Sequence, residues 1–161
     1  MNDSTFWHIV QNSKGDPDSI KEQLEKLTES QVQEWRRIYW EKHKALHSWK
    51  TWNAGYLICG GMSDDSYHYF KAWLIGKGQK VYQTALDNPD DLADHVTTDE
   101  ADETGCDNEL LNYAADEVME SLYSESDPDY ETGEEGPPSG EPFDEDDPTI
   151  GFPKLTAKFW N

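Results

Sequence analysis

The spacing of apolar residues constrains the fold of this chain more than any other feature of its sequence. Apolar side chains recur three or four residues apart, and no run alternates apolar with polar residues as a half-buried strand does. Phe6, Ile9 and Val10 begin the pattern, and Tyr67 and Phe70 continue it later in the chain. The pattern predicts an all-α protein, folded as a compact multi-helix domain.

Start and stop signals divide this pattern into separate helices. Asp16-Pro17 is typical of an N-cap followed by proline at the first helical position. Thr28-Glu29-Ser30-Gln31 has the form of a capping box, which begins a third helix that we expect to reach about Ser48. Gly60-Gly61 ends a fourth helix, because glycine tolerates the left-handed conformation found after helix ends. Ser63 is the expected N-cap of the fifth.

The length of 161 residues suits one domain. Aromatic and apolar residues return after a long acidic stretch, at Phe143, Phe152 and Phe159, which argues against a disordered tail. We therefore expect five parts within the domain. They are a helical body (1–95), an acidic loop (96–107), a helix (108–123), an extended acidic segment (124–142) and a C-terminal segment docked on the helical body (143–161).

The formal charge of −21 is concentrated in the second half of the chain. Residues 1–86 carry a net charge of +1, whereas residues 87–161 carry −22. Such a charge repels nucleic acid and anionic membrane surfaces, so we expect neither as a direct partner. It favours a basic protein as the partner, although solubility alone would also explain it.

The cysteine content and the N-terminus indicate where the protein is found. Cys59 and Cys106 are too few for a disulfide framework and match no metal-binding pattern, which favours a reduced, cytoplasmic setting. The first residues, Met1-Asn2-Asp3-Ser4, lack the basic and apolar regions of a signal peptide. Apolar runs are too short to span a bilayer, and no motif predicts a cofactor.

The run from Gly60 to Ile75 resembles the signature of a bacterial domain-of-unknown-function family, the one numbered 4240. Its Gly-Gly, Ser-Asp-Asp and aromatic-rich helix ending in Trp-Leu-Ile are similar to residues 60–75 of this chain. Phe6-Trp7, the segment 88–93 and the segments 140–146 and 152–155 resemble further parts of the family. The resemblance therefore implies that the acidic C-terminal region is part of the fold. It implies no activity.

Asp64 and Asp65 are the leading candidates for a site, because they follow a double glycine at a helix start and have aromatic neighbours in Tyr67 and His68. As functional groups they would bind a cation or act as acid and base. As structural groups they would cap the helix and anchor a neighbouring element. We favour the structural role and keep all four residues as binding candidates.

Tryptophan, histidine and acidic residues elsewhere in the chain offer further candidate sites. Trp40 and Trp49 are the tryptophans that we expect most at a surface groove. His43 and His47 have a helical spacing compatible with a metal, but no third ligand follows from the sequence. Residues 127–133 resemble a calcium loop only in part, and an EF-hand is rejected because the glycine is misplaced. No residue is predicted to be catalytic, and no metal site is predicted.

Three functions remain open at this point. The preferred one is a non-enzymatic protein-binding module for a basic partner, with an immunity-like or regulatory role by analogy. The first alternative is a metal-assisted enzyme that uses Asp64 or Asp65 in an aromatic-lined cleft. The second alternative is a nucleic-acid mimic, in which carboxylates imitate phosphates. The sequence predicts no oligomeric state.

Overall fold

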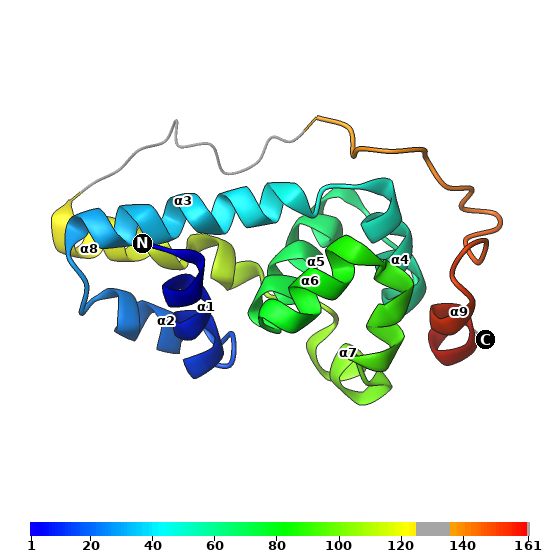
Figure 1. Cartoon of the computed structure of the whole chain (residues 1–161), viewed down its shortest axis with the longest axis horizontal. Coiled ribbons are helices and arrows are strands. Elements are labelled where there is room, and N and C mark those ends of the chain that lie inside the picture. The colour runs from blue at the N-terminus through cyan, green and yellow to red at the C-terminus, as the bar shows by residue number, and fades with distance from the viewer. Residues whose placement is uncertain (125–135, 161) are drawn as a thin grey trace.

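The computed structural model describes residues 1–124 and 136–160 and confirms the all-α prediction. Throughout these residues the regular elements are helices, with no strand longer than an isolated bridge (Figure 1). Two of them, η1 and η2, are 3₁₀ helices. The elements are α1 (Asp3–Asn12), α2 (Pro17–Leu24), α3 (Glu29–Ala45), α4 (Trp49–Cys59), α5 (Asp64–Gly76), α6 (Gln79–Asp87), η1 (Pro89–Asp94), α7 (Thr98–Thr104), η2 (Glu109–Tyr113), α8 (Ala114–Tyr123) and α9 (Pro153–Phe159).

Side-chain caps fix where most of these helices begin. The carboxylate of Asp16 accepts a hydrogen bond from the Ser19 backbone N–H, and Thr28 and Gln31 form the expected capping box. The third helix, however, does not reach Ser48. It ends at Ala45, because Ser48 takes an extended backbone conformation and caps α4 instead.

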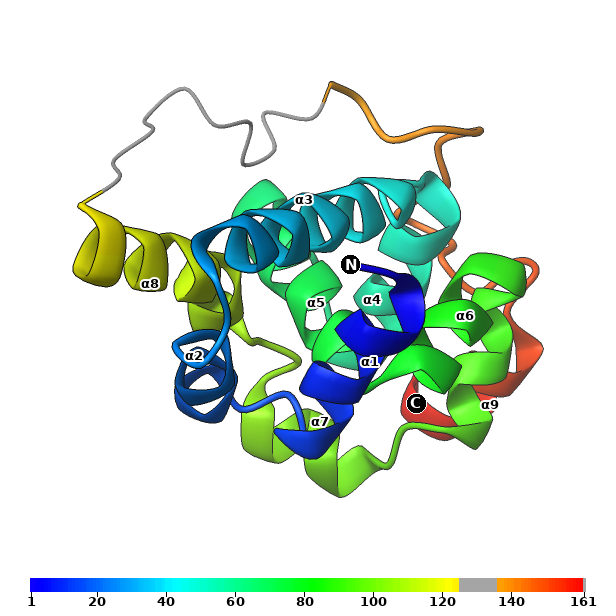
Figure 2. The ribbon, with the colours of Figure 1, turned by 60° about the vertical axis from the view of Figure 1, so that its left-hand side comes forward.

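Helix α3 is the central element, and aromatic rings fill the space around it (Figure 1). Helix α1 packs against both α3 and α5, as Figure 2 shows, and α8 packs along α3. Phe6 of α1 stacks on Trp35 of α3 with ring centroids 5.0 Å apart, and Trp35 stacks on Tyr39 at 5.4 Å. All three side chains are buried, so a few large residues supply much of the core.

One connection in the core requires glycine. Gly15 follows α1 with φ of +71°, and a Cβ atom at this position would lie 2.3 Å from the carbonyl oxygen of Gly76. Both the left-handed backbone and the close approach exclude a side chain here. The contact brings the turn between α1 and α2 against the end of α5, the helix that carries the candidate site.

The prediction of an acidic loop at residues 96–107 is wrong, since residues 98–104 form helix α7. Thr97 and Glu100 form a capping box that starts this helix, and Ala101 is its buried residue. Glu100 also forms an ion pair with Lys77 at the end of α5. The segment has too few apolar residues to show a helical period, so the sequence did not predict the helix. One buried alanine and one cap suffice for a helix of two turns.

The described C-terminal residues lie against the helical body in two places. Residues 136–142 form no helix, and Ser139 pairs with Ser48 through an isolated parallel bridge. Helix α9 then packs against α4 and η1, where Leu155 is fully buried and Phe152 is 8% exposed. The C-terminal segment is therefore docked on the body, as expected. The partial calcium-loop resemblance at 127–133 lies outside the described residues.

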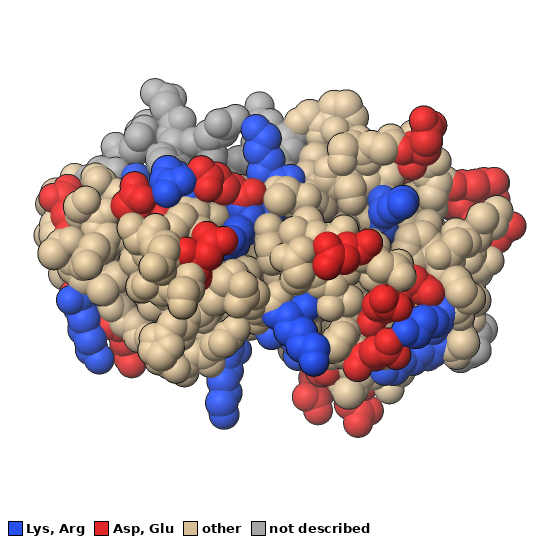
Figure 3. Space-filling model, in the orientation of Figure 1, with Lys and Arg blue, Asp and Glu red and all other residues tan. Residues whose placement is uncertain are grey.

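No helix in the described ranges is long and apolar enough to cross a membrane. Surface charge on the face seen in Figure 3 is mixed, and blue and red side chains lie beside one another. The ion pairs of the described residues include Lys42 with Asp3 at 3.0 Å and Arg37 with Glu41 at 2.7 Å. Many of the bases are thus already neutralised within the chain.

Alkaline pH should lower the stability of the fold, because it ionises the buried Tyr82 hydroxyl. Its hydroxyl is buried and donates a hydrogen bond to the Lys42 carbonyl (3.2 Å), and burial, with a further contribution from Asp3, raises its pKa from 10.0 to about 12. The neutral hydroxyl therefore stabilises the fold fully below pH 10, and this contribution is lost as the pH rises through about 12. We expect the melting temperature to fall more steeply between these pH values in the wild type than in Tyr82→Phe. Melting temperatures measured by circular dichroism that fall equally with pH in the two proteins would contradict this.

Candidate functional site

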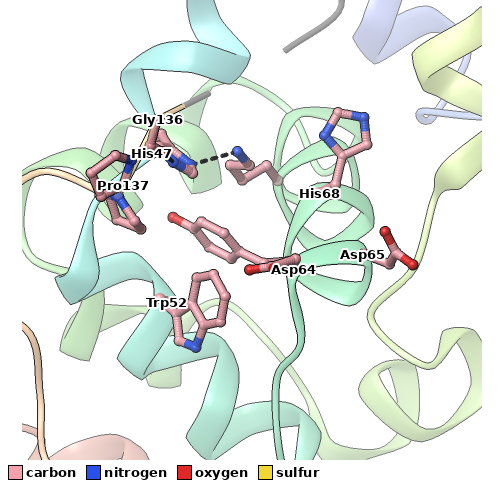
Figure 4. A pocket seen from close by; sticks show the side chains of 10 residues that line it. His47, Trp52, Asp64, Asp65, His68, Gly136 and Pro137 are labelled. Atoms are coloured by element: carbon pink, nitrogen blue, oxygen red, sulfur yellow. Dashed lines mark hydrogen bonds between the residues drawn. The ribbon is translucent and has the colours of Figure 1, made fainter. Parts of the chain in front are cut away.

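A pocket of about 760 Å³ opens beside the first turn of α5 (Figure 4). It lies between that helix, the start of α4 and residues 136–138 of the extended acidic segment. Four of the six predicted binding residues are found in it. The lining residues are His47, Trp52, Asp64, Asp65, Tyr67, His68, Lys71, Gly136, Pro137 and Pro138.

Asp64 and Asp65 are exposed at this pocket and do not cap α5, although they lie in its first turn. Ser63 caps α5, and its capping box is completed by Ser66 rather than by a carboxylate. Among the described residues, Asp64 and Asp65 form no hydrogen bond or ion pair, so the anchoring role expected for them is not observed. Their side chains point in different directions, as expected for adjacent helical residues (Figure 4).

Tyr67 and Trp52 form the aromatic wall of the pocket. Their ring centroids lie 4.7 Å apart, and Tyr67 is 1% exposed. The Tyr67 hydroxyl donates to the carbonyl oxygen of Leu46 at 2.6 Å and accepts from the backbone N–H of Ser48 at 3.2 Å. Tyr67 therefore holds the turn between α3 and α4 in place, which fixes the position of the wall.

Lys71, which is buried, and His47, which is half-buried, form a polar pair in the pocket lining. The Lys71 Nζ atom lies 2.9 Å from His47 Nδ1 and 4.7 Å from the centroid of the Tyr67 ring. His47 Nε2 lies 2.7 Å from the carbonyl oxygen of Gly136, which can only accept. Nε2 is therefore the N–H of the neutral ring, and Nδ1 accepts from Lys71. The pair joins α5 to Gly136 in the extended acidic segment.

His47 does not share a helical face with His43, because α3 ends at Ala45 and His47 belongs to the turn that follows. His43 is fully buried, and its Nε2 lies 3.1 Å from the carbonyl oxygen of His68. Within the described part of the chain, no group of three or more His, Cys, Asp or Glu side chains is placed to hold a metal ion. The described residues therefore offer no ligand set to which Asp64 or Asp65 would contribute.

The two tryptophans predicted at a groove stand behind the pocket rather than in it. Trp40 is 8% exposed, and its ring lies 5.9 Å from that of His68, so it supports the outer wall. Trp49 is half-buried and packs on Trp52 at 5.3 Å and on Phe143 at 6.3 Å. Both residues position pocket residues without lining the pocket.

Sequence reasoning missed six of the lining residues, namely His47, Trp52, Lys71 and residues 136–138 of the extended acidic segment. Lys71 falls on the buried face of α5, where its aromatic neighbours indicated packing. Gly136 lies 89 residues from the histidine that it contacts, so no local pattern reports the contact. A lysine within the apolar stripe was the one available signal, since lysine is rarely fully buried without a partner.

The arrangement suits recognition of a cationic side chain. Two exposed carboxylates stand beside the pocket, where they would attract an ammonium or guanidinium group. The Tyr67 ring already has a cation over it, because Lys71 Nζ lies 4.7 Å from its centroid. The imidazole of His47 is committed on both nitrogens, so it does not present a free lone pair as a general base would.

Comparison with known proteins gives a family but no named relative. No curated protein and no solved structure matches the chain. A family model described as a protein of unknown function (DUF4240) matches residues 1–121, which include the α5 signature and the helical walls of the pocket. The match ends before residues 136–160, so the resemblance of the C-terminal segment to the family stays a prediction. Because the model covers most of its length, the chain belongs to the DUF4240 family.

Proposed function

We propose that this protein is a non-enzymatic binding module, and that its partner is a basic protein which places a lysine or arginine side chain at the mouth formed by Asp64 and Asp65. The observation that carries the proposal is that both carboxylates are exposed beside an aromatic wall while Ser63 does the capping. Two acids that do not cap the helix are available to a ligand.

The charge of the whole chain supports the same class of partner. A net charge of −21 attracts a basic protein over long range and raises the rate of encounter. Many of the chain's own bases are paired internally, including Lys21 with Glu117 at 2.8 Å and Arg36 with Asp116 at 3.0 Å. Long-range attraction does not select a contact point, so the local arrangement at α5 supplies the specificity.

A metal-assisted enzyme is the second candidate, and the pocket with its polar Lys71–His47 pair is the observation in its favour. A bound divalent ion would stabilise the wild type by mass action. We expect magnesium, manganese and calcium to leave the melting temperature unchanged. A rise in the wild type that is absent in Asp64→Asn/Asp65→Asn would promote the enzyme over the binding module.

Replacing both acids should weaken binding without unfolding the protein. In Asp64→Asn/Asp65→Asn we expect a loss of stability of at most about 1 kcal/mol, because only the interaction with the helix dipole is removed. Affinity for decalysine should fall about 10-fold, from two ion pairs and an aromatic contact. Isothermal titration calorimetry at physiological salt measures it.

The matched control is Asp99→Asn/Asp102→Asn, which removes the same charge from exposed positions of α7. We expect this variant to lose less than about 3-fold in affinity, since only the long-range attraction changes. An equal loss in both variants would mean that decalysine reads net charge alone. That result would contradict a site at α5.

A further inference from the structure

A second hollow lies on a different part of the molecule, between α4, the Asp87–Pro89 turn and the C-terminal segment. It has a volume of about 450 Å³. Its apolar surface comes from Phe143, Ile150 and Phe152. We call it the C-terminal groove. Its volume and lining are those of a site for a side chain or small ligand.

The apolar wall of the C-terminal groove is held rigidly. Phe152 is 8% exposed, and Phe143 is half-buried with its ring 5.6 Å from Tyr56 and 6.3 Å from Trp49. Asn53, which is 3% exposed, donates a hydrogen bond to the carbonyl oxygen of Pro148 at 2.8 Å and ties the segment to α4. The groove is therefore formed before any ligand arrives.

Ile150 contributes to this wall but is 71% exposed. The neighbouring Phe152 and Leu155 are buried against the helical body, whereas Ile150 is left in solvent. Covering a solvent-exposed branched aliphatic side chain with a partner lowers the free energy, because apolar surface is removed from water. Its position at the edge of a preformed apolar groove shows where that partner would lie.

The rim of the groove is acidic. Asp87, Asp144 and Asp147 line it and are exposed, and within the described ranges none of them forms an ion pair. Lys50 is the only base among the lining residues. The rim therefore complements a positively charged ligand. It disfavours a second copy of this chain, which carries the same charge of −21.

We propose that the C-terminal groove docks a cationic amphipathic segment of the partner protein, with an aliphatic side chain covering Ile150 and flanking lysines or arginines facing Asp87, Asp144 and Asp147. This inference rests on the proposed function, because it assumes the same basic partner. It adds a requirement that the α5 site lacks, namely an apolar side chain between the basic residues.

The test compares two peptides of equal charge in calorimetric titrations of the full chain. One is decalysine, and the other carries ten lysines interrupted by two leucines. Burial of a leucine against Ile150 should make the second peptide bind about 10-fold more tightly to the wild type. We expect Ile150→Ser to abolish this advantage while leaving the affinity for decalysine unchanged.

The matched control is Leu110→Ser, which alters a side chain that is 62% exposed on η2 and does not line the groove. The leucine advantage should survive in this variant. No advantage in the wild type, or equal loss in both serine variants, would overturn the groove proposal. The two proposals fail in different measurements. The decalysine titration of Asp64→Asn/Asp65→Asn tests the α5 site, whereas the leucine advantage and its loss in Ile150→Ser test the groove, so a failed leucine advantage leaves the α5 site standing.

Discussion

Deleting residues 143–161 should lower the free energy of unfolding by about 5 kcal/mol. The deletion removes Leu155 and Phe152 from the core, and burial of each such side chain contributes about 1.5–3 kcal/mol. It also uncovers the faces of α4 and η1 on which α9 packs. Urea unfolding followed by tryptophan fluorescence measures the change.

The control for this deletion is Ile150→Ser in the same segment. Ile150 is 71% exposed, so we expect its replacement to change stability by less than about 0.5 kcal/mol. An unchanged unfolding midpoint after the deletion would mean that the segment is not docked in solution. A segment that is not docked could not form the apolar wall of the C-terminal groove.

Replacing Asp90 by alanine should cost about 2–4 kcal/mol, because its carboxylate caps a helix that lies far along the chain. Asp90 is 6% exposed and accepts hydrogen bonds from the backbone N–H groups of Lys154 (3.2 Å) and Leu155 (2.9 Å) at the start of α9. Helix α9 has no cap of its own. Without Asp90, two backbone donors lose their acceptor, and at least that of Leu155 is buried.

Asp91 is the matched control for Asp90, because it is the next residue and also contacts Lys154. That contact is an exposed ion pair at 3.0 Å, which contributes at most about 1 kcal/mol. We therefore expect Asp91→Ala to unfold close to the wild type and Asp90→Ala well before it. Equal losses in the two variants would show that Asp90 acts only through its charge.

Local signals in the sequence predicted most of the helices. The capping box at Thr28 and the cap at Ser63 lie where their side chains predict, and the apolar stripe of α5 is buried. The errors concern competition between neighbouring elements. Ser48 had two uses, as the end of one helix or the cap of the next, and only the tertiary contact with Tyr67 and Ser139 decides between them.

The candidate site was predicted where it is local and missed where it is long-range. Asp64, Asp65, Tyr67 and His68 are close in sequence, and the structure brings all four to one pocket. The role expected for the two acids differed, because Ser63 satisfies the helix start that they were assigned to cap. The Lys71–His47 pair and its link to Gly136 depend on contacts that no spacing rule encodes.

Affinity capture from the native cell extract tests the central proposal most directly. Three versions of the full chain serve as bait: the wild type, Asp64→Asn/Asp65→Asn, and Asp99→Asn/Asp102→Asn. We expect the wild type and the α7 variant to capture the same basic protein, the α5 variant to lose it, and raised salt to weaken the capture. Retention of that protein by the α5 variant, or its loss from both variants alike, would contradict a binding site at Asp64 and Asp65.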